Sequence, residues 1–378
     1  MVITRVWAQA VSVPVGKATR MSTRVLDRRD YVLVHVETDD GTRGLGFAYI
    51  GTAGGAAAAE LVAELLVPTL EGADPDDIAA LWERMYQETL LAGRRGIVLR
   101  ALSAVDIALW DHAAKRRQVP LGVLLGGTRK PVPAYASGGY YRPDEGPWAE
   151  AVAREIHGNR KQGFRDHKIK VGGLPVVEDA ERVAAAVDAL GSDGRLALDC
   201  NNAYRTATEA SQAIRAFEEA AGSRGLWWVE EPLSPEDVDG HARVVDSVDT
   251  QIATGEVHQT RWEFRELLQR RAADIVQPDA GVLGGVTEWM RVAHAAEVFS
   301  VPVAPHWHAN LHVHLAAAIP GCLTVEFFAL EKDIFNFERL LRADTRLTSE
   351  DGHVTVPDRP GLGVELDQEA VEQFAITA

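Results

Sequence analysis

The second part of the chain alternates short apolar runs with helical stretches, and this alternation constrains the fold more than any other feature. From about residue 131 the apolar runs are "VPAYASGG", "DHKIKVGG", "RLALDCN", "LWWVEEP", "QIATGE", "DIVQPDA", "VPVAPH" and "LTVEFF". They follow one another at intervals of ~20–35 residues, the spacing of repeated βα units. The pattern predicts a closed parallel barrel over residues 131–345. An open doubly wound sheet is the alternative, but it usually carries a Gly-rich phosphate loop after its first strand, and "VPAYASGGYYRP" matches that loop poorly.

Residues 1–130 have a different pattern and predict a separate domain. Two strand-like runs occupy residues 1–50, and helical patterns follow at residues 56–70, 74–90 and 98–118. Strands followed by helices are typical of a small α+β domain. Residues 346–378 contain turn signals and a final strand-like run, "GLGVELDQEAVEQF". We expect this last segment to return to the first domain.

Most of the predicted barrel strands end in a side chain that can do chemistry. These side chains are Lys168 and Lys170, Asp199, Glu230, Glu256, Asp279, His306 and Glu326. In a parallel barrel all C-terminal strand ends meet at one rim, where the active site lies. Each acidic residue alone could be a helix cap or a salt-bridge partner. Capping does not explain seven strand ends in register, so we expect the group to converge in one pocket.

Asp199, Glu230 and Glu256 lie on three successive strand ends. Three carboxylates in one pocket repel one another unless a cation neutralises them. Oxygen-only ligands favour a hard divalent ion, and a partly hydrated octahedral site suits Mg²⁺; Zn²⁺ is disfavoured because no cysteine or histidine need join them. Glu231 follows Glu230 and should face the opposite way along the strand, where we interpret it as a structural ion-pair partner.

Lys168 and Lys170 are unusual because arginine carries most of the positive charge of this chain. Arginine stays protonated, whereas lysine can be pushed to release its proton. Alternation along a strand places both lysines on one face, here the barrel interior. Two ammonium groups near a divalent cation disfavour each other's charge, so we expect a lowered lysine pKa and a usable general base. The alternative is a pair of solvated lysines on a strand edge.

Asp279 and His306 end adjacent predicted strands. A carboxylate beside an imidazole fixes its tautomer and raises its basicity, which indicates a second acid/base group. A structural histidine is the alternative. Glu326 could hydrogen-bond a substrate oxygen, or stabilise negative charge if protonated; a core ion pair is the alternative.

Weaker signals indicate substrate contacts. The basic segment "GKATRMSTR", residues 16–24, could close over the pocket and present Arg20 or Arg24 to a second carboxylate, although a mobile surface loop is an equal alternative. His308 and His312 have helical spacing; we interpret them as polar helix residues, with His308 a candidate substrate contact. Tyr140 contributes to a polar wall that suits a polyol.

With these residues in view, the sequence resembles the mandelate racemase-like subgroup of the enolase superfamily. The motifs that carry the resemblance are "KIK", "DCNN", "VEEP", "GE", "QPDAGVLGG", "PH" and "VEFF". The resemblance covers nearly the whole chain. It implies an α/β fold in which a modified (β/α)7β TIM-type barrel carries an α+β capping domain, built from the N-terminal segment and the C-terminal tail. It also implies even-numbered homo-oligomers, from dimer to octamer.

The resemblance further implies roles for the residues at the rim. Asp199, Glu230 and Glu256 would bind Mg²⁺, and the motif places Asn201 as a substrate contact. Lys170, supported by Lys168, would be a base on one face of the substrate.

His306, oriented by Asp279, would be acid or base on the opposite face. The shared first step removes a proton α to a carboxylate, and Mg²⁺ stabilises the resulting negative charge.

The step after proton removal decides the reaction. Protonation of a departing β-hydroxyl by His306 gives a dehydratase of a sugar acid, an aldonate or aldarate, yielding a 2-keto-3-deoxy acid. Return of a proton to the other face gives a racemase or epimerase, and loss of a ring oxygen gives a cycloisomerase. We favour dehydration because the polar wall suits a polyhydroxy acid. A non-catalytic sugar-acid or metal-binding protein is the rival from another class, because fold does not fix function.

Bulk properties exclude several other classes. The net charge of −16 opposes nucleic-acid binding, because a phosphate-binding surface is usually basic. Two cysteines, Cys200 and Cys322, are too few for a disulfide scaffold. No apolar run reaches the roughly 18 residues of a membrane span, and the N-terminal residues lack the features of a signal peptide. We therefore expect a cytoplasmic enzyme that acts on a small carboxylate and binds neither nucleic acid nor membrane.

Overall fold

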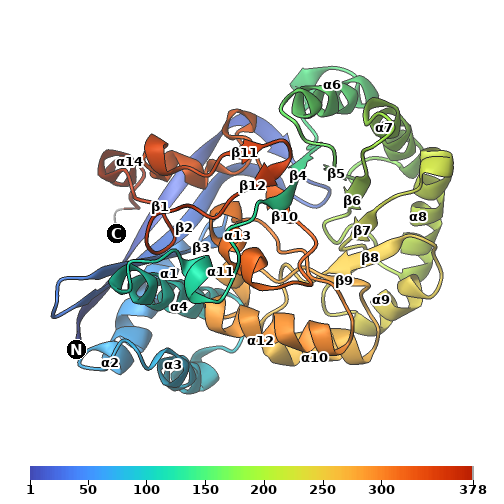
Figure 1. Ribbon diagram of the computed structural model, residues 1–378. Coiled ribbons are helices and arrows are strands. Elements are labelled where there is room, and N and C mark those ends of the chain that lie inside the picture. The colour runs from blue at the N-terminus through green and yellow to red at the C-terminus, as the bar shows by residue number, and fades with distance from the viewer. Residues whose placement is uncertain (377–378) are drawn as a thin grey trace.

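The protein, described by a computed structural model over residues 1–376, consists of an antiparallel sheet with its helices beside a parallel barrel (Figure 1). The predicted combination of a capping domain and a (β/α)7β barrel is confirmed. The N-terminal strands and the C-terminal tail lie together on one side of the molecule, away from the barrel helices α6 to α9 (Figure 1).

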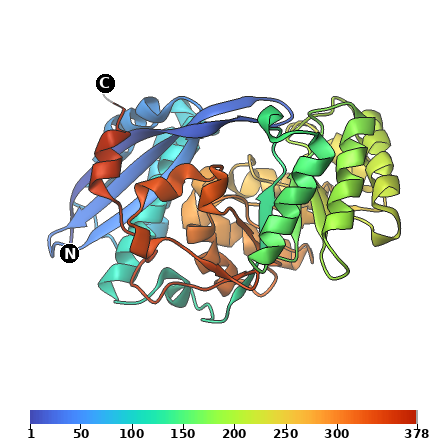
Figure 2. The ribbon, with the colours of Figure 1, turned by 90° about the horizontal axis from the view of Figure 1, so that it is seen from above.

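The capping sheet has the order β1-β2-β3, formed by β1 (Ile3–Arg20), β2 (Val25–Thr38) and β3 (Arg43–Gly51). The central strand β2 is buried on both faces, because Val32, Val34 and Val36 pack in one apolar cluster while Tyr31 and Leu33 pack in another. The hairpin of β1 and β2 is long and reaches across to the barrel (Figure 2). The segment that the sequence presents as a basic loop, residues 16–24, is therefore mostly the tip of this hairpin.

The helices of the capping domain pack on its sheet or on one another. They are α1 (Gly55–Leu61), the π-helical η1 (Val62–Leu66), α2 (Val67–Leu70), α3 (Ile78–Ala92), α4 (Ile97–Arg116) and α5 (Leu121–Leu124). Helix α4 packs closely on β3, and two glycines of β3 permit this approach. A Cβ atom at Gly46 would lie 1.9 Å from the carbonyl oxygen of Ala104, and one at Gly44 would lie 2.0 Å from that of Ala108.

The barrel strands follow the predicted order around the ring. They are β4 (Val132–Gly138), β5 (His167–Lys170), β6 (Leu196–Asp199), β7 (Trp228–Glu230), β8 (Gln251–Thr254), β9 (Ile275–Val276) and β10 (Val325–Phe327). Neighbours from β4 to β9 pair in parallel, and β10 pairs with β4. The predicted strand at "VPVAPH" forms only isolated bridges, from Val303 to Val276 and to Cys322. Hydrogen-bonded ladders therefore join all neighbouring strands of the ring except at this position, between β9 and β10.

Helices alternate with the strands on the outside of the barrel (Figure 1). They are α6 (Trp148–Lys161), α7 (Val176–Ala189), α8 (Ala207–Ala221), α9 (Val238–Val245), α10 (Thr260–Gln269), α11 (Ala280–Leu283), α12 (Gly285–Val298) and α13 (Ala309–Ala318). Short 3-10 turns occur at η2 (Pro143–Glu145), η3 (Gly222–Arg224), η4 (Leu330–Lys332), η5 (Asn336–Leu340) and η6 (Ala343–Thr345). No helix within residues 1–376 combines the length and apolar character that crossing a membrane requires.

The C-terminal segment differs from its predicted form. The small strands β11 (Ser349–Glu350) and β12 (His353–Val354) extend the sheet beside β4, and the expected final strand is instead an irregular stretch followed by α14 (Gln368–Gln373). Asp367 accepts hydrogen bonds from the backbone N–H groups of Glu369 and Ala370 and so caps this helix. Beyond the helix, Ala375 forms a bridge to Val11 of β1.

Candidate active site

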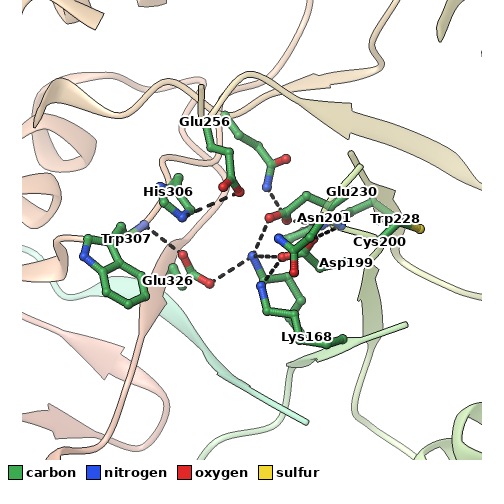
Figure 3. A network of polar contacts seen from close by, with 12 residues as sticks. Lys168, Asp199, Cys200, Asn201, Trp228, Glu230, Glu256, His306, Trp307 and Glu326 are labelled. Carbon is green, nitrogen blue, oxygen red and sulfur yellow. Dashed lines mark hydrogen bonds and ion pairs between the residues drawn. The ribbon is translucent and has the colours of Figure 1, made fainter. Parts of the chain in front are cut away.

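Three carboxylates converge at the C-terminal ends of β6, β7 and β8. The parallel register places Asp199 beside Glu230, and Glu230 beside Ala253, three residues before Glu256. One carboxylate oxygen from each of Asp199, Glu230 and Glu256 lies within 4.8 Å of the others. We call these three residues the carboxylate triad (Figure 3).

The carboxylate triad has the chemistry of a divalent-cation site. Asp199 and Glu230 are buried, and burial together with Asp199 and Glu256 raises the pKa of Glu230 to about 8, although Lys168 opposes this shift. Oε2 of Glu256 is buried and accepts no hydrogen bond within residues 1–376. Three oxygen donors that repel one another fit a hard ion such as Mg²⁺.

The two lysines of β5 contact this cluster. Nζ of Lys168 lies 2.6 Å from Oε1 of Glu230 and 2.9 Å from Oε1 of Glu326, and Lys170 contacts Asp199 (Figure 3 shows Lys168). Burial favours a lower pKa for both lysines, but Glu230 and Glu326 outweigh it for Lys168, and Asp199 outweighs it for Lys170. The pKa of each lysine is raised. The adjacent carboxylates dominate these shifts, and the lowering that we expect from the sequence depends on the charge of a bound divalent cation, so it stays a prediction.

His306 lies between two carboxylates. Its Nδ1 atom is 2.9 Å from Oδ2 of Asp279, and its Nε2 atom is 3.5 Å from Oε2 of Glu256. Burial lowers the pKa of His306, yet Glu256 and the hydrogen bond to Asp279 outweigh burial and raise it to about 9. Asp279 is held in turn by the backbone N–H of Gly281, at 2.8 Å from Oδ1.

Glu326 is an ion-pair partner at the base of the site. Its Oε1 atom faces Lys168, and its Oε2 atom accepts a 2.8 Å hydrogen bond from the backbone N–H of Trp307 (Figure 3). Burial raises the pKa of Glu326, but Lys168 and His306 outweigh burial and hold it at about 2. Of the sequence alternatives for this residue, the geometry favours the ion pair over a protonated donor.

A cavity above these groups brings together the capping domain and the barrel rim. Its lining includes Lys170, His306, Asp279 and Glu256 from the barrel. The candidate substrate contacts that also line it are Arg24, Tyr140 and Asn201.

The other two candidate contacts lie elsewhere. The guanidinium of Arg20 donates to the carbonyl oxygen of Gly173 at 2.8 Å. His308 is fully buried, with its ring centroid 4.8 Å from that of Phe47 and 5.1 Å from those of Phe335 and Phe337. Neither residue is part of the cavity lining.

Comparison with known proteins agrees with this geometry. Residues 4–126 match the mandelate racemase / muconate lactonizing enzyme N-terminal domain, and residues 151–370 match the enolase C-terminal domain-like family. The chain belongs to the mandelate racemase / muconate lactonizing enzyme family of the enolase superfamily. The predicted membership is confirmed.

Relatives within this family differ in their reactions. The chain is 36% identical over 357 residues to arabinonate dehydratase of Saccharolobus solfataricus, covering 91% of this chain and 90% of that one. It is 36% identical to D-galactarolactone cycloisomerase of Agrobacterium fabrum, covering 92% of each. Among solved structures, L-talarate dehydratase of a Polaromonas species, complexed with Mg and L-glucarate, superposes with a TM-score of 0.89 at 34% identity, over 100% of this chain and 98% of that one.

Glu231 lies in the cavity lining and not on the opposite face that the strand pattern predicts. Glu231 has a φ of 45°, in the left-handed region, so the alternation of the strand ends at Glu230. Glu231 therefore lines the cavity, and it forms no ion pair within residues 1–376. The expected structural ion pair is wrong. The only sequence signal for the change is Pro232, since a proline cannot continue a strand ladder.

Arg29 and Arg100 also line the cavity, and the sequence patterns do not predict either of them as a site residue. Arg29 belongs to β2 and Arg100 to α4, which are both elements of the capping domain. Within a strand or a helix pattern, an arginine carries no sequence signal that distinguishes it from a solvated charge. Only the packing of the two domains of this family member brings both residues to the site.

Proposed function

We propose that this protein is a Mg²⁺-dependent hydro-lyase that removes water from a sugar acid to give a 2-keto-3-deoxy acid. The observation that carries the proposal is the placement of two proton-transfer groups, Lys170 and His306, on one cavity beside the carboxylate triad. Lys170 contacts Asp199 at one side of the triad, and His306 lies against Glu256 at the other. A binding protein would not need two such groups.

Asp199, Glu230 and Glu256 are the residues that would hold the ion. When bound, Mg²⁺ supplies positive charge that polarises the substrate carboxylate and offsets the acidic neighbours of Lys170. Lys168 supports the arrangement because its ammonium group forms ion pairs with both Glu230 and Glu326.

Two side chains of this protein, Lys170 and His306, carry out the two proton transfers. Lys170 in its neutral form takes the proton α to the carboxylate at Nζ. His306 donates a proton from Nε2 to the departing β-hydroxyl, which leaves as water. Asp279 holds the opposite ring nitrogen, Nδ1, and so keeps the tautomer and the ring orientation fixed.

Two features support dehydration over isomerisation. The cavity wall carries polar groups, Tyr140, Asn201 and Arg24, that suit a polyhydroxy acid. Arabinonate dehydratase and L-talarate dehydratase are among the similar proteins. A cycloisomerase is the second candidate, because D-galactarolactone cycloisomerase is as similar in sequence as arabinonate dehydratase.

The experiment is a screen of aldonic and aldaric acids with the protein and Mg²⁺. A 2-keto-3-deoxy product, detected with semicarbazide and by NMR, is the expected result. Exchange of the α-proton in D₂O without net dehydration would contradict dehydration and favour racemisation. Conversion of a sugar-acid lactone without loss of water would favour the cycloisomerase.

Three further assignments are predictions. We propose that the functional division of the chain is 1–130, 131–345 and 346–378, that the protein is an even-numbered homo-oligomer, and that it acts in the cytoplasm. Light scattering after size-exclusion chromatography tests the oligomeric state, and a monomer at micromolar concentration would contradict it.

A further inference from the structure

Three arginines of the capping domain form one wall of the active-site cavity. Arg24 comes from the β1–β2 turn, Arg29 from β2 and Arg100 from α4. We call these three residues the arginine wall. No aspartate or glutamate within residues 1–376 forms an ion pair with any of them, although Glu231, Glu256 and Asp279 line the same cavity.

Arg29 is the most constrained member of the arginine wall. Only 3% of its surface is exposed, and Nε donates a 2.9 Å hydrogen bond to the carbonyl oxygen of Ile334. Its guanidinium carbon lies 4.4 Å from the ring centroid of Trp307 and 5.2 Å from that of Tyr49. These contacts fix the plane of the guanidinium and leave its terminal nitrogens without a carboxylate. A buried cation without an anionic partner is costly, so this position indicates an anion supplied from outside the chain.

Arg100 and Arg24 extend the same positive surface. Nη1 of Arg100 donates a 2.5 Å hydrogen bond to the carbonyl oxygen of Tyr49, the residue on which Arg29 stacks. Arg24 is exposed at the hairpin tip and lines the cavity mouth. The three arginines therefore differ in exposure along the cavity lining: Arg29 is buried, Arg100 is half-buried and Arg24 is exposed.

The position of Arg29 relates the arginine wall to the reacting centre. Trp307, beneath its guanidinium, follows His306 directly in the chain. The carboxylate next to the reacting carbon is assigned to the ion at the carboxylate triad, so this carboxylate does not also neutralise the arginine wall. A planar guanidinium matches a carboxylate by two parallel hydrogen bonds.

We propose that the arginine wall is a second carboxylate subsite, and that the preferred substrates are dicarboxylic sugar acids, aldarates, rather than monocarboxylic aldonates. The proposal rests on the proposed function, and it adds the class of sugar acid. The carboxylate next to the reacting carbon lies at the ion, and the carboxylate at the other end of the chain pairs with Arg29, Arg24 and Arg100. A purely structural role for Arg29, as a clamp on Trp307 and Tyr49, is the competing outcome.

The test is binding to the Lys170→Ala protein loaded with Mg²⁺, so that turnover does not consume the ligand. Isothermal titration calorimetry compares aldarates with aldonates of equal length and configuration, such as galactarate with galactonate and glucarate with gluconate. At least one diacid should bind about tenfold or more tightly than its monoacid partner. If no diacid in the panel is preferred, the proposal is overturned.

Variants then assign the preference to the arginine wall. Arg29→Met in the same background should reduce diacid affinity at least about tenfold and change monoacid affinity less than about twofold. Arg24→Met, at an exposed position that tolerates substitution, should reduce the diacid preference about threefold. Arg28→Met, the exposed neighbour of Arg29, is the matched control and should change neither affinity. Equal losses for both acids in Arg29→Met, together with an unchanged preference in Arg24→Met, would overturn the proposal.

Failure of the subsite proposal can be distinguished from failure of the proposed dehydration. Turnover of the wild-type protein is measured on the same pairs of acids. A protein that dehydrates aldonates and aldarates equally well keeps the proposed function and loses the subsite. A protein that prefers to bind diacids but never forms a 2-keto-3-deoxy acid keeps the subsite and loses dehydration.

Discussion

The guanidinium of Arg182 donates a 2.7 Å hydrogen bond to the backbone carbonyl oxygen of Lys170. Arg182 also donates to the carbonyl oxygen of Gly139 at 2.6 Å and pairs with Asp179 at 2.7 Å, and all of these contacts are buried. Asp179 accepts a further bond from the hydroxyl of Tyr141, at 2.9 Å. The backbone of Tyr141 pairs with that of Arg20 at the hairpin tip. A continuous polar network therefore connects the capping hairpin to the end of the strand that carries Lys170.

We predict that Arg182→Met lowers kcat by about 10- to 100-fold with a smaller effect on KM. The substitution leaves the buried Asp179 without its charge partner and frees the end of β5, so Lys170 is held less well in its reacting position. The rate of α-proton exchange in D₂O, followed by NMR, reports the lysine step directly. Arg215→Met, at an exposed arginine of α8, is the matched control and should leave kcat, KM and the rate of proton exchange unchanged. A fall in melting temperature with unchanged proton exchange would show that Arg182 is only structural.

The two lysines of β5 should differ sharply when each is removed. In the absence of Mg²⁺, Lys168→Met removes the cation that pairs with the buried Glu230 and Glu326, and it should lower stability by about 3–5 kcal/mol. Lys170→Ala should abolish turnover, retain Mg²⁺ binding and cost less stability, because Asp199 keeps Lys168 at 3.6 Å. Urea unfolding, calorimetric titration of Mg²⁺ and the substrate assay check the three statements. Comparable activity losses with equal stability in both variants would contradict these separate roles.

Asp279→Asn should shift the pH profile of the reaction. Asp279 helps to hold the pKa of His306 near 9, so its removal lowers that pKa toward the ordinary value of about 6.5. An acid is active below its pKa, so the alkaline limb of kcat against pH should move to lower pH by about one unit. The profile between pH 6 and pH 10 provides the measurement. An unchanged alkaline limb would mean that His306 does not act as the acid.

Several histidines outside the site should make the protein acid-sensitive. Burial lowers the pKa of His167, His258 and His314 to about 4 each. A histidine with a depressed folded pKa contributes full stability above its unfolded pKa of about 6.5, and that stability is lost as pH falls toward 4. Each should cost roughly 1–2 kcal/mol at pH 5. Urea unfolding at pH 7.5, 6 and 5 measures the loss.

A pair of variants isolates one histidine. His167→Gln should lose less stability between pH 7.5 and pH 5 than the wild type, and His157→Gln, at an exposed position on α6, should follow the wild type. A pH-independent free energy of unfolding over this interval would contradict the burial argument.

The sequence predicts the barrel and the residues at its rim because both depend on local patterns. Each of Asp199, Glu230 and Glu256 follows an apolar run, and the geometry of a parallel barrel brings such positions together. The sequence does not predict which carboxylates surround each lysine ammonium group and raise its pKa, because these contacts depend on side-chain packing. The turn of Glu231 into the cavity depends on one left-handed backbone angle, which a strand pattern does not reveal.

The capping-domain contacts were the hardest to predict. Arg20 and His308 are close in sequence to the cavity lining but point to Gly173 and to a cluster of phenylalanines. Arg29 and Arg100 carry no local signal and reach the cavity only through the packing of two domains. Side chains that meet across an interface between domains follow from that interface, and a single sequence does not specify it.

The most direct test of the account is the location of the divalent ion. A crystal structure grown with Mn²⁺ in place of Mg²⁺, with an anomalous difference map, determines it. We predict one strong peak coordinated by Asp199, Glu230 and Glu256, with ion–oxygen distances of about 2.1–2.3 Å. A map without a peak at this position under saturating Mn²⁺, or a peak held by other residues, would contradict the central claim.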